Sequence, residues 1–532
     1  MIALAESHLT LRLFQQTLGR IERLAGHLGK ILKRLGWKSV AARLRFDAGA
    51  LIEIDLRSLA LFRIGIAVTL LVDLASRVRD LDALYGASGV LPPELARRLW
   101  DLRVAASPFT WVAAWPSLLW SGVALLAVAA LCLALGVAPR LSAAVAWGLL
   151  AALQDRNPGL YMGGDRYLLL MLMWCILLPT GARLSLRPAP AGVTRIRAWA
   201  GAGLLLQVML VYLLTGLKKT GPGWFDGSAL WYALNDEEYV SAAGRWLRFQ
   251  TMLVGPLSFA VKWVEIVGSL MAFSPWRNAA ARAITVGVFW AFHLGLQTFQ
   301  AIGVFQLVGL SAWLVFLPSA MWDGRWRRRA GGREEPIRAA ERVQPARWSE
   351  GLALVPIIYL VIVAGHAVTG VVVRGNPHYP VPASIDRIAV FLHLQEGWAM
   401  FASTRREQLW IVVPGRLTDG SEIDVLRRAP LDLDMPSDLQ SAQRGFRWTL
   451  YLGNVIKKGI REPAFRATHL AMLEYLCREW NVRHGLERRL ERVALVAVTR
   501  AIPGPGLVSA GSGSPHVLAT HECLQPPEAQ GR

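Results

Sequence analysis

Charged residues are scarce in this chain of 532 residues: Asp, Glu, Lys and Arg make up 18% of it, whereas 54% is hydrophobic. A water-soluble protein needs a polar surface on every side, so this shortage excludes a soluble globular protein. Cysteines are scarce too, since the chain has four, and their spacing does not indicate a metal site. Two of them, Cys477 and Cys523, can pair if their compartment is oxidising.

Acidic residues are also few, and the excess of basic residues gives a formal charge of +20. Such an excess is common in proteins that bind nucleic acid. The densest basic run, however, lies between two apolar segments, where the cytoplasmic loops of membrane proteins are basic. It comprises Arg325, Arg327, Arg328 and Arg329. The sequence therefore argues against a nucleic acid partner.

Long apolar runs, by contrast, are abundant. A transmembrane helix needs about 20 mostly apolar residues to cross a hydrocarbon core roughly 30 Å thick. The segment 283–319 is a continuous, mostly apolar stretch that is interrupted near its middle by Gln297, Gln300 and Gly303, so it forms either two helices or one helix with a re-entrant turn. Counted as two, it brings the predicted spans to nine, at residues 57–75, 117–137, 139–155, 166–182, 197–217, 254–274, 283–300, 302–319 and 352–373.

The arginines of the short loops determine the predicted orientation. Basic residues precede the first span and recur at Arg140, in 183–197, in 277–282 and in 320–350, which share one side if the spans alternate. This pattern predicts a cytoplasmic N-terminus and places the chain after about residue 375 on the outer side. Arginine far outnumbers lysine, which has 8 of the 58 basic residues. That bias indicates a GC-rich bacterial source, so we expect a multi-pass inner-membrane protein with a periplasmic C-terminal domain.

The predicted fold is a polytopic α-helical membrane protein with a small C-terminal α+β extramembrane domain. At the N-terminus, apolar residues recur at helical spacing within a basic segment, 9–38, which predicts an amphipathic helix on the cytoplasmic leaflet. Near the other end, Asp419 and Gly420 join two apolar runs in the manner of a β-hairpin, and 464–496 has a helical pattern. The predicted parts are a basic arm (1–50), a transmembrane bundle (51–320), a basic cytoplasmic linker (321–350), a final transmembrane helix (351–374), a periplasmic α+β domain (375–500) and a disordered tail (501–532).

Ionisable residues within the predicted spans are costly to bury, so each is expected to form a pair or to line a polar cavity. Lys262 and Glu265 are three residues apart on one helix and can neutralise each other. His366 is expected to be a hydrogen-bonded packing residue. The full set comprises Arg63, Asp73, Lys262, Glu265, His293 and His366.

An adjacent lysine pair, Lys218 and Lys219, closes the fifth predicted span. Two interpretations of this pair stay open. Lysines at a membrane boundary commonly extend their ammonium groups towards water. Alternatively, a desolvated lysine beside another cation can lose its proton, which arginine cannot, and can then act as a general base.

Several motifs together resemble one family. They are the run GLKKTGPGWFDGSALWYAL at 216–234, the upstream LALFRIGIA and NPGLYMGGDRYLLL, the downstream FHLGLQTFQAIGVF, and the late GWAMFAS and LTDGSEIDVL. These motifs are similar to the HTTM (horizontally transferred transmembrane) domain family, a bacterial membrane family similar to vitamin K-dependent gamma-glutamyl carboxylase. The resemblance covers roughly residues 50–490.

The resemblance implies a quinone-dependent carboxylase. In that enzyme a lysine deprotonates the hydroquinone form of vitamin K, reaction with oxygen gives a base that removes a glutamate γ-proton, and carbon dioxide is added. The matching lysine in this chain is Lys219, the second of the pair. His293 matches the histidine of the F-H segment, and Gly303 with Phe305 match the I-G-x-F that follows.

One position departs from the carboxylase. Where the carboxylase has a functional histidine before an apolar span, this sequence has Asp165 or a neighbouring glycine. A carboxyl group cannot act as a neutral imidazole donor near pH 7. The candidate catalytic residues, all expected near the outer boundary, are thus Lys219, Lys218, His293 and Asp165, and the candidate cofactor-binding residues are Trp224 and Glu265.

Four functions remain open at this point. The first is an enzyme that handles oxygen or carbon dioxide with a quinone, such as reduced vitamin K. The second is a membrane protein that binds a quinone or a lipid without catalysis, and the third is a scaffold that acts through its outer domain. The fourth is transport, because transporters also place charges within the membrane. The expected partners are the lipid bilayer, a lipophilic quinone and a protein substrate on the outer side.

Overall fold

The computed structural model describes residues 48–100, 102–190, 192–324, 341–376, 380–507 and 513–524. The chain divides into two compact units, Met1–Leu51 and Ile52–Arg532. The features below belong to the second unit. The predicted amphipathic helix at 9–38 and the basic run at 325–329 lie outside the described residues.

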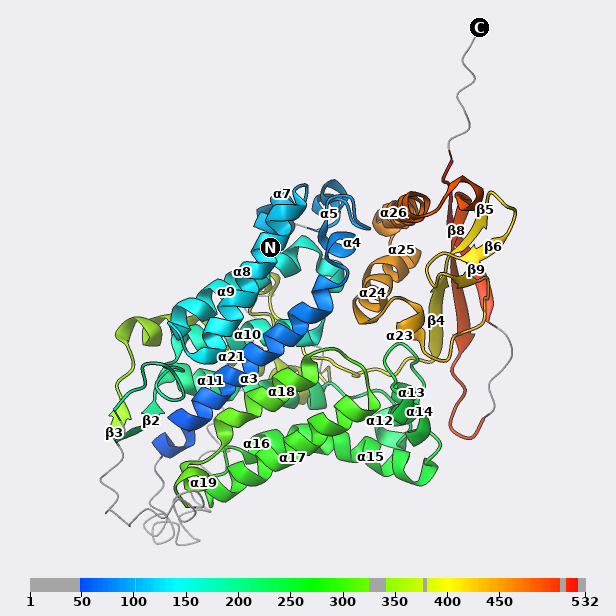
Figure 1. Cartoon of the computed structure of the whole chain (residues 1–532). Coiled ribbons are helices and arrows are strands. Elements are labelled where there is room, and N and C mark those ends of the chain that lie inside the picture. The colour runs from blue at the N-terminus through cyan, green and yellow to red at the C-terminus, as the bar shows by residue number, and fades with distance from the viewer. Residues whose placement is uncertain are drawn as a thin grey trace, which may run out of the picture. The chain divides into compact units, whose positions relative to one another are not determined.

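Each of the nine predicted apolar segments forms a helix (Figure 1). Six helices within the described ranges are long and apolar enough to cross a membrane. They are α3 (Leu56–Val78), α8 (Pro116–Leu135), α11 (Trp199–Leu217), the helix Thr251–Met271, α17 (Asn278–Phe299) and α21 (Arg347–Val372). The helix Thr251–Met271 consists of α15 (Thr251–Trp263), a π-helical turn (Val264–Gly268) and α16 (Ser269–Met271).

The remaining three helices are too short or too charged to meet this criterion. α9 (Pro139–Arg156) has 18 residues, of which three are charged, and α10 (Gly163–Leu177) has 15. α18 (Phe305–Trp313) continues as a 3-10 turn that ends at Phe316. Six spans, rather than the nine predicted, are therefore supported by helix length and composition in the described part of the chain.

The ambiguous segment 283–319 forms two helices. α17 ends at Phe299 and α18 begins at Phe305. Gly303, between them, has a φ of 68°, and a Cβ at this position would lie 2.4 Å from the ring of Phe446. Both the left-handed backbone and the close packing require glycine here.

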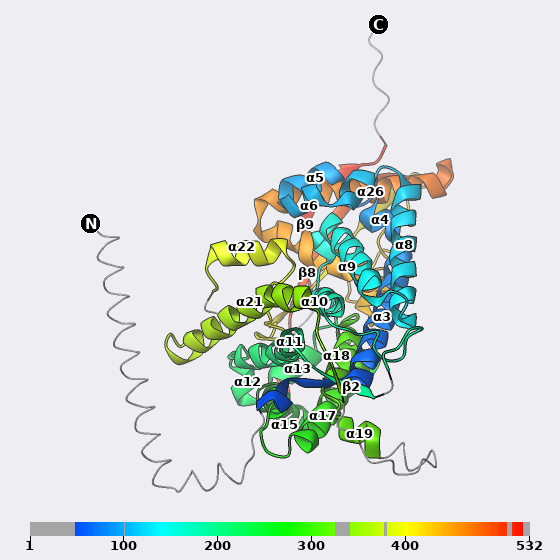
Figure 2. The same ribbon diagram turned by 90° about the vertical axis from the view of Figure 1, so that its left-hand side faces the viewer.

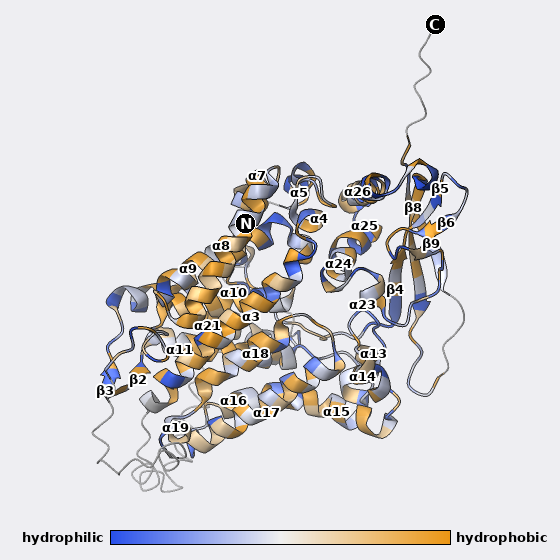
Figure 3. Ribbon diagram, viewed as in Figure 1, coloured by the Kyte–Doolittle hydropathy of each residue, from blue (hydrophilic) through white to orange (hydrophobic). Residues whose placement is uncertain are grey.

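Hydrophobic residues predominate along the helices of the bundle (Figure 3), and many of them are exposed on its outside as well as buried in its interior. Most of α3 and α11 is buried, whereas most of α8, α15, α17 and α21 faces outward. Exposed residues such as Leu125, Leu257 and Val361 would be unfavourable in water but match lipid tails. The helical part therefore has a buried centre and a lipid-facing layer.

A small sheet joins the segments that lead into three helices. β1 (Glu53–Asp55) pairs antiparallel with β2 (Val193–Arg197), which pairs parallel with β3 (Glu341–Val343). An ion pair of 3.0 Å between Glu53 and Arg195 supports the β1–β2 contact. Because these strands precede α3, α11 and α21, the three helices begin at the same end of the bundle.

After α21 the chain forms an α+β structure, as predicted (Figure 2). The sheet has the order β4-β8-β5-β6-β7, and β9 pairs with β8. The predicted hairpin at Asp419 and Gly420 is confirmed, because it joins β5 to β6. The strands are β4 (Glu407–Val412), β5 (Pro414–Leu417), β6 (Glu422–Asp424), β7 (Ala429–Pro430), β8 (Leu490–Ala501) and β9 (Ser514–Glu522), and the helices include α22 (Ala383–Phe391), α23 (Leu439–Ala442), α24 (Phe446–Tyr451) and α26 (Ala467–Arg483).

Two predictions for this part are wrong. The helical pattern at 464–496 continues as α26 only to Arg483, and its last residues belong to β8. The tail predicted to be disordered from 501 contains β9, which pairs antiparallel with β8. A disulfide between Cys477 on α26 and Cys523 also holds β9 in place. Both contacts join residues at least 15 positions apart in the sequence, so local composition does not reveal them.

A buried cluster of four charges attaches α24 to the bundle. Arg77 on α3 lies 2.7 Å from Asp73 on the same helix and 2.5 Å from Asp165 on α10. Arg447 on α24 pairs with both aspartates, at 3.0 Å from Asp165. Two arginines and two aspartates cancel in charge, which is the condition under which buried charges are tolerated.

We expect Arg447→Ala to destabilise the protein by about 3–5 kcal/mol, because one cation would remain for two buried aspartates. Unfolding of the purified protein in detergent measures this change. Arg416→Ala on β5 is the control, since Arg416 is exposed and lies 3.9 Å from Glu491. Its expected effect is below about 0.5 kcal/mol. Equal unfolding midpoints for the two variants would contradict the role of the cluster.

Candidate functional site

The lysine pair follows the last residue of α11. Lys219 is 1% exposed, whereas Lys218 is half-buried. Gly216 allows the helix Thr251–Met271 to approach this end of α11, because a Cβ at Gly216 would lie 2.7 Å from Ile266 and 3.1 Å from Glu265. The small residue thus brings Glu265 close to the turn that carries Lys219.

Lys219 forms a buried ion pair with Glu265. Its Nζ lies 2.7 Å from the Glu265 carboxylate, donates a hydrogen bond of 3.0 Å to the carbonyl oxygen of Met400, and lies 4.9 Å from the centre of the Trp224 ring. Glu265 belongs to the π-helical turn, a local irregularity that is frequent at functional sites. Trp224 Nε1 donates a hydrogen bond of 2.9 Å to the carbonyl oxygen of Phe401. The two candidate cofactor-binding residues, Glu265 and Trp224, thus lie around the amino group of Lys219.

The environment of Lys219 makes its ammonium group more acidic than that of an ordinary lysine. Burial lowers the pKa of Lys219, and the Glu265 carboxylate partly opposes this shift. Burial also lowers the pKa of Lys218. A lowered pKa makes proton transfer at the Lys219 Nζ easier than at an ordinary lysine.

The ion pair lies in the wall of an apolar cavity of about 240 Å³, which we call the lysine cavity. α11, α15, α17 and the segments around Trp224 and Met400 enclose it. Gln300 is one of its few polar residues; its amide nitrogen donates to the carbonyl oxygen of Ala233 at 3.1 Å, and its Oε1 has no protein partner. The polar lining residues are Tyr212, Lys219, Ser258, Glu265 and Gln300, and the aromatic ones include Trp224, Phe292, Phe299, Phe305 and Phe401.

His293 lies directly behind this wall. Its Nε2 is 2.6 Å from the hydroxyl oxygen of Tyr212, which lines the lysine cavity. His293 is fully buried, and a Cβ at Gly309 on α18 would lie 2.2 Å from its ring. Glycine therefore makes the space for the imidazole, and Tyr212 connects the predicted histidine to the cavity.

Asp165, the fourth candidate catalytic residue, is engaged elsewhere. Its carboxylate accepts hydrogen bonds from Arg77, from Arg447 and, at 3.0 Å, from the backbone N–H of Met162. It is absent from the described lining of the lysine cavity, as is Lys218. The structure thus does not bring Asp165 together with Lys219, because the N-terminus of α10 and two arginines already hold this carboxylate.

The other ionisable residues of the spans have local explanations. Lys262 lies 4.0 Å from the centre of the Phe225 ring, so the predicted Lys262–Glu265 pair is wrong; Glu265 pairs with Lys219 instead. His366 is half-buried on α21. Asp73 belongs to the four-charge cluster. Arg63 donates hydrogen bonds to the carbonyl oxygens of Ala134, Thr180 and Leu184.

Four residues that line the cavity are not among the site residues predicted from the sequence. Gln300 is visible in the sequence as a polar interruption of an apolar stretch. Met400 and Phe401 belong to the GWAMFAS motif, but they act through backbone carbonyls, which a sequence does not display. Tyr212 has no signal of its own, because one tyrosine within an apolar helix is usual at a packing position.

Six membrane-length helices in the described chain, together with the α+β part, define a polytopic helical membrane protein. A family model described as the HTTM domain matches residues 52–322, which is 271 of the 532 residues. The chain belongs to the HTTM domain family, as its motifs indicate. No curated protein and no solved structure matches the chain. Lys219, Glu265 and His293 lie within the matched residues, whereas Met400 and Phe401 lie beyond them.

We expect Glu265→Gln to lower the pKa of Lys219 further, because the variant removes the carboxylate that raises it. Titration by NMR with ¹³C-labelled lysine side chains measures this change, and the 8 lysines of the chain keep the spectrum simple. The signal of Lys458, which lies 3.5 Å from Glu462, is the internal reference. An unchanged midpoint at Lys219 would show that Glu265 does not act on this amine.

Proposed function

We propose that this protein is a membrane enzyme that binds a reduced quinone in the lysine cavity and performs an oxygen-using, carboxylase-like reaction with Lys219 as the base. One observation carries the proposal: a buried Lys219–Glu265 pair lies in the wall of a predominantly apolar cavity. Burying two charges is costly, and apolar residues of similar size would often be at least as stable. The pair is therefore better explained by chemistry than by stability.

The residues of the cavity suit a quinone ring. A volume of about 240 Å³ lies just below the range of about 300–1,000 Å³ for drug-sized ligands, so it accommodates a ring system but not a long tail. Trp224 and Phe292 supply aromatic faces, and the Gln300 Oε1 can accept a hydrogen bond from a ring hydroxyl. Leu257 and Ala291 line the cavity and are also exposed on α15 and α17, which supports a lipid-side path for a tail.

Proton transfer at Lys219 is the central step of the proposal. In its neutral form, which burial favours, the Lys219 Nζ accepts a proton from a ring hydroxyl. The ammonium that results is stabilised by the Glu265 carboxylate and the Met400 carbonyl oxygen. A bound reduced quinone would supply the electrons for the reaction with oxygen. Tyr212, bonded to His293, adds a hydroxyl group to the wall.

For the location, we propose a bacterial inner-membrane protein with a cytoplasmic N-terminus and a periplasmic α+β part. The Cys477–Cys523 disulfide supports this orientation, because disulfides persist in oxidising compartments such as the periplasm. The basic loops on the opposite side agree with it. In this orientation Lys219 lies at the periplasmic end of α11.

Binding of a quinone or another lipid without catalysis is the second candidate function. The predominance of apolar side chains in the wall favours it. Binding depends on the shape of the cavity, whereas the proposed reaction depends on the Lys219 amine. Substitution of that amine therefore separates the two functions.

We expect Lys219→Met to reduce incorporation of labelled carbon dioxide into a glutamate peptide by roughly 10²- to 10⁴-fold, the usual contribution of a general base. The assay uses the purified full-length protein with a reduced quinone. Lys218→Met is the matched control and should keep most of the activity, because Lys218 does not line the described cavity. Wild-type protein that binds quinone but incorporates no label would exclude the carboxylase-like reaction and leave binding alone.

A second test fills the cavity. A Cβ at Gly295 on α17 meets no atom within 4 Å, and Gly295 lines the lysine cavity, so Gly295→Leu places its side chain in the ligand space. Overpacking costs about 1–3 kcal/mol, so we expect quinone binding weaker by about 5- to 150-fold. Gly287→Leu on the same helix is the control, because its Cβ is equally unobstructed but lies outside the lining. Equal quinone affinity for both variants, by tryptophan fluorescence, would place the ligand elsewhere.

A further inference from the structure

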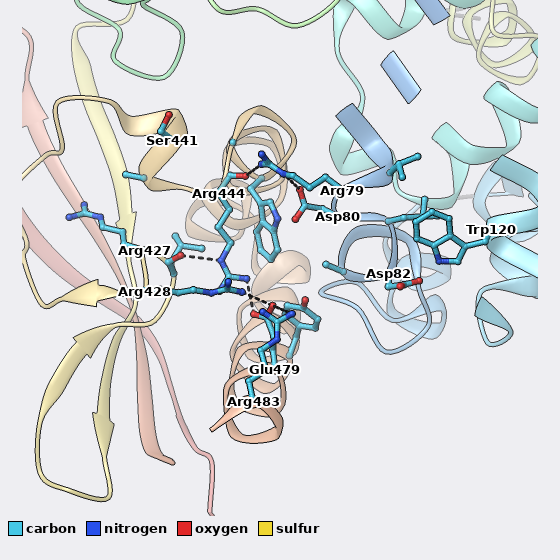
Figure 4. Close-up of a pocket in the computed structure, with 18 residues that line it drawn as sticks. Arg79, Asp80, Asp82, Trp120, Arg427, Arg428, Ser441, Arg444, Glu479 and Arg483 are labelled. Carbon is cyan, nitrogen blue, oxygen red and sulfur yellow. Dashed lines mark hydrogen bonds and ion pairs between the residues drawn. The ribbon is translucent and has the colours of Figure 1, made fainter. Parts of the chain in front are cut away.

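A second and larger cavity, of about 700 Å³, lies between the bundle and the α+β part (Figure 4). The turn after α3, the short helix α4 (Leu81–Tyr85) and α8 line one side of it. α23, α24, α26 and the segment after β6 line the other. We call it the arginine cleft, because it is lined by Arg79, Arg427, Arg428, Arg444 and Arg483 against Asp80, Asp82 and Glu479.

Positive charge in the arginine cleft is incompletely neutralised. Arg428, Arg444 and Arg483 all bind the one carboxylate of Glu479, at 2.9, 2.8 and 3.3 Å (Figure 4). One negative charge therefore serves three guanidinium groups. The side chains of Arg428 and Arg483 are 47% and 56% exposed, so a ligand can reach them.

Two of these arginines also have a strained backbone. Arg428 and Arg444 have φ values of 56° and 63°, in the left-handed region that non-glycine residues rarely adopt. Such strain persists where the surrounding structure fixes a residue, and it is concentrated at binding sites. Here it accompanies two guanidinium groups that converge on Glu479. A bound anion would offset both the strain and the repulsion among the arginines.

The opposite wall places the cleft at the membrane surface. Trp120, near the start of α8, lines the cleft and is exposed. Trp111 and Trp115, just before α8, are exposed as well. Tryptophans of transmembrane helices are enriched at the level of the lipid headgroups. The arginine cleft therefore lies where a lipid headgroup can enter it.

We propose that the arginine cleft binds the phosphate of an anionic phospholipid headgroup. The planar guanidinium forks of Arg428 and Arg483 match phosphate oxygens in geometry and charge. Asp80 and Asp82, on the bundle side of the cleft (Figure 4), can accept hydrogen bonds from the hydroxyls of a glycerol headgroup. The same two carboxylates repel an extended acidic peptide, which favours a compact anion. A lipid bound here contacts both walls and holds the α+β part against the bundle.

The test measures lipid binding to the full-length protein in detergent, by native mass spectrometry and by the shift of its unfolding temperature. The probes are phosphatidylglycerol, phosphatidylcholine, inorganic phosphate and a glutamate-rich peptide. We expect phosphatidylglycerol to bind and to raise the unfolding temperature more than the other three. Its affinity should fall about 25-fold in the Arg428→Gln/Arg483→Gln double variant, at about fivefold for each arginine. Glu479 keeps Arg444 as its partner in this variant.

The matched control is the Arg416→Gln/Arg492→Gln double variant. These arginines lie on the sheet of the same α+β part, are 65% and 58% exposed, and pair with Glu491 and Glu522. The control should bind phosphatidylglycerol as the wild type does. Equal binding of phosphatidylcholine, tighter binding of free phosphate or of the acidic peptide, or equal affinity in the two double variants would each overturn the proposal.

Discussion

The four-charge cluster of Asp73, Arg77, Asp165 and Arg447 is the interaction on which the arrangement of the whole second unit depends. A single buried charge is far too costly in an apolar bundle, so the two arginines and two aspartates are stable only together. Three of them come from α3 and α10, and the fourth comes from α24, some 280 residues beyond Asp165. Once α24 is attached in this way, the chain before it is held over the end of α11, and the arginine cleft has a wall on each side.

Lys219 meets the same physical constraint with a different result. In the cluster each arginine binds both aspartates, so the charges are fully compensated. Lys219 has the carboxylate of Glu265 and the carbonyl oxygen of Met400, and the apolar lysine cavity lies on its other side. Its charge is therefore less strongly favoured, and burial lowers its pKa. The charges of the cluster therefore have more opposing partners than the amine of Lys219 has.

Sequence patterns predict those features that depend on neighbours in the chain. Hydrophobic runs locate all nine apolar helices, the Asp419–Gly420 turn locates a hairpin, and the motif around Lys219 contains Trp224. Features set by distant contacts are not predicted. Pairing with β8 orders β9, although a glycine- and serine-rich segment precedes it. Lys219 and Trp224 donate hydrogen bonds to backbone carbonyl oxygens near residue 400, far along the chain. The contact between Asp165 and Arg447 is not predicted for the same reason, since Arg447 lies far along the sequence.

The loop at 396–401 shows why the two parts of the protein act as one. Glu396 accepts a hydrogen bond of 2.8 Å from Gln207 on α11 and another from Trp398, and burial raises the pKa of Glu396 to about 8. These contacts hold the loop against α11 without adding a charge next to Lys219. The loop can therefore present the Met400 carbonyl oxygen to the Lys219 Nζ and leave Glu265 as its acidic partner. Removal of the α+β part would remove the Met400 carbonyl oxygen together with the surface of the α+β part itself. Loss of function after such a truncation would consequently agree with an enzyme and with a scaffold alike, and only a change confined to the amine distinguishes them.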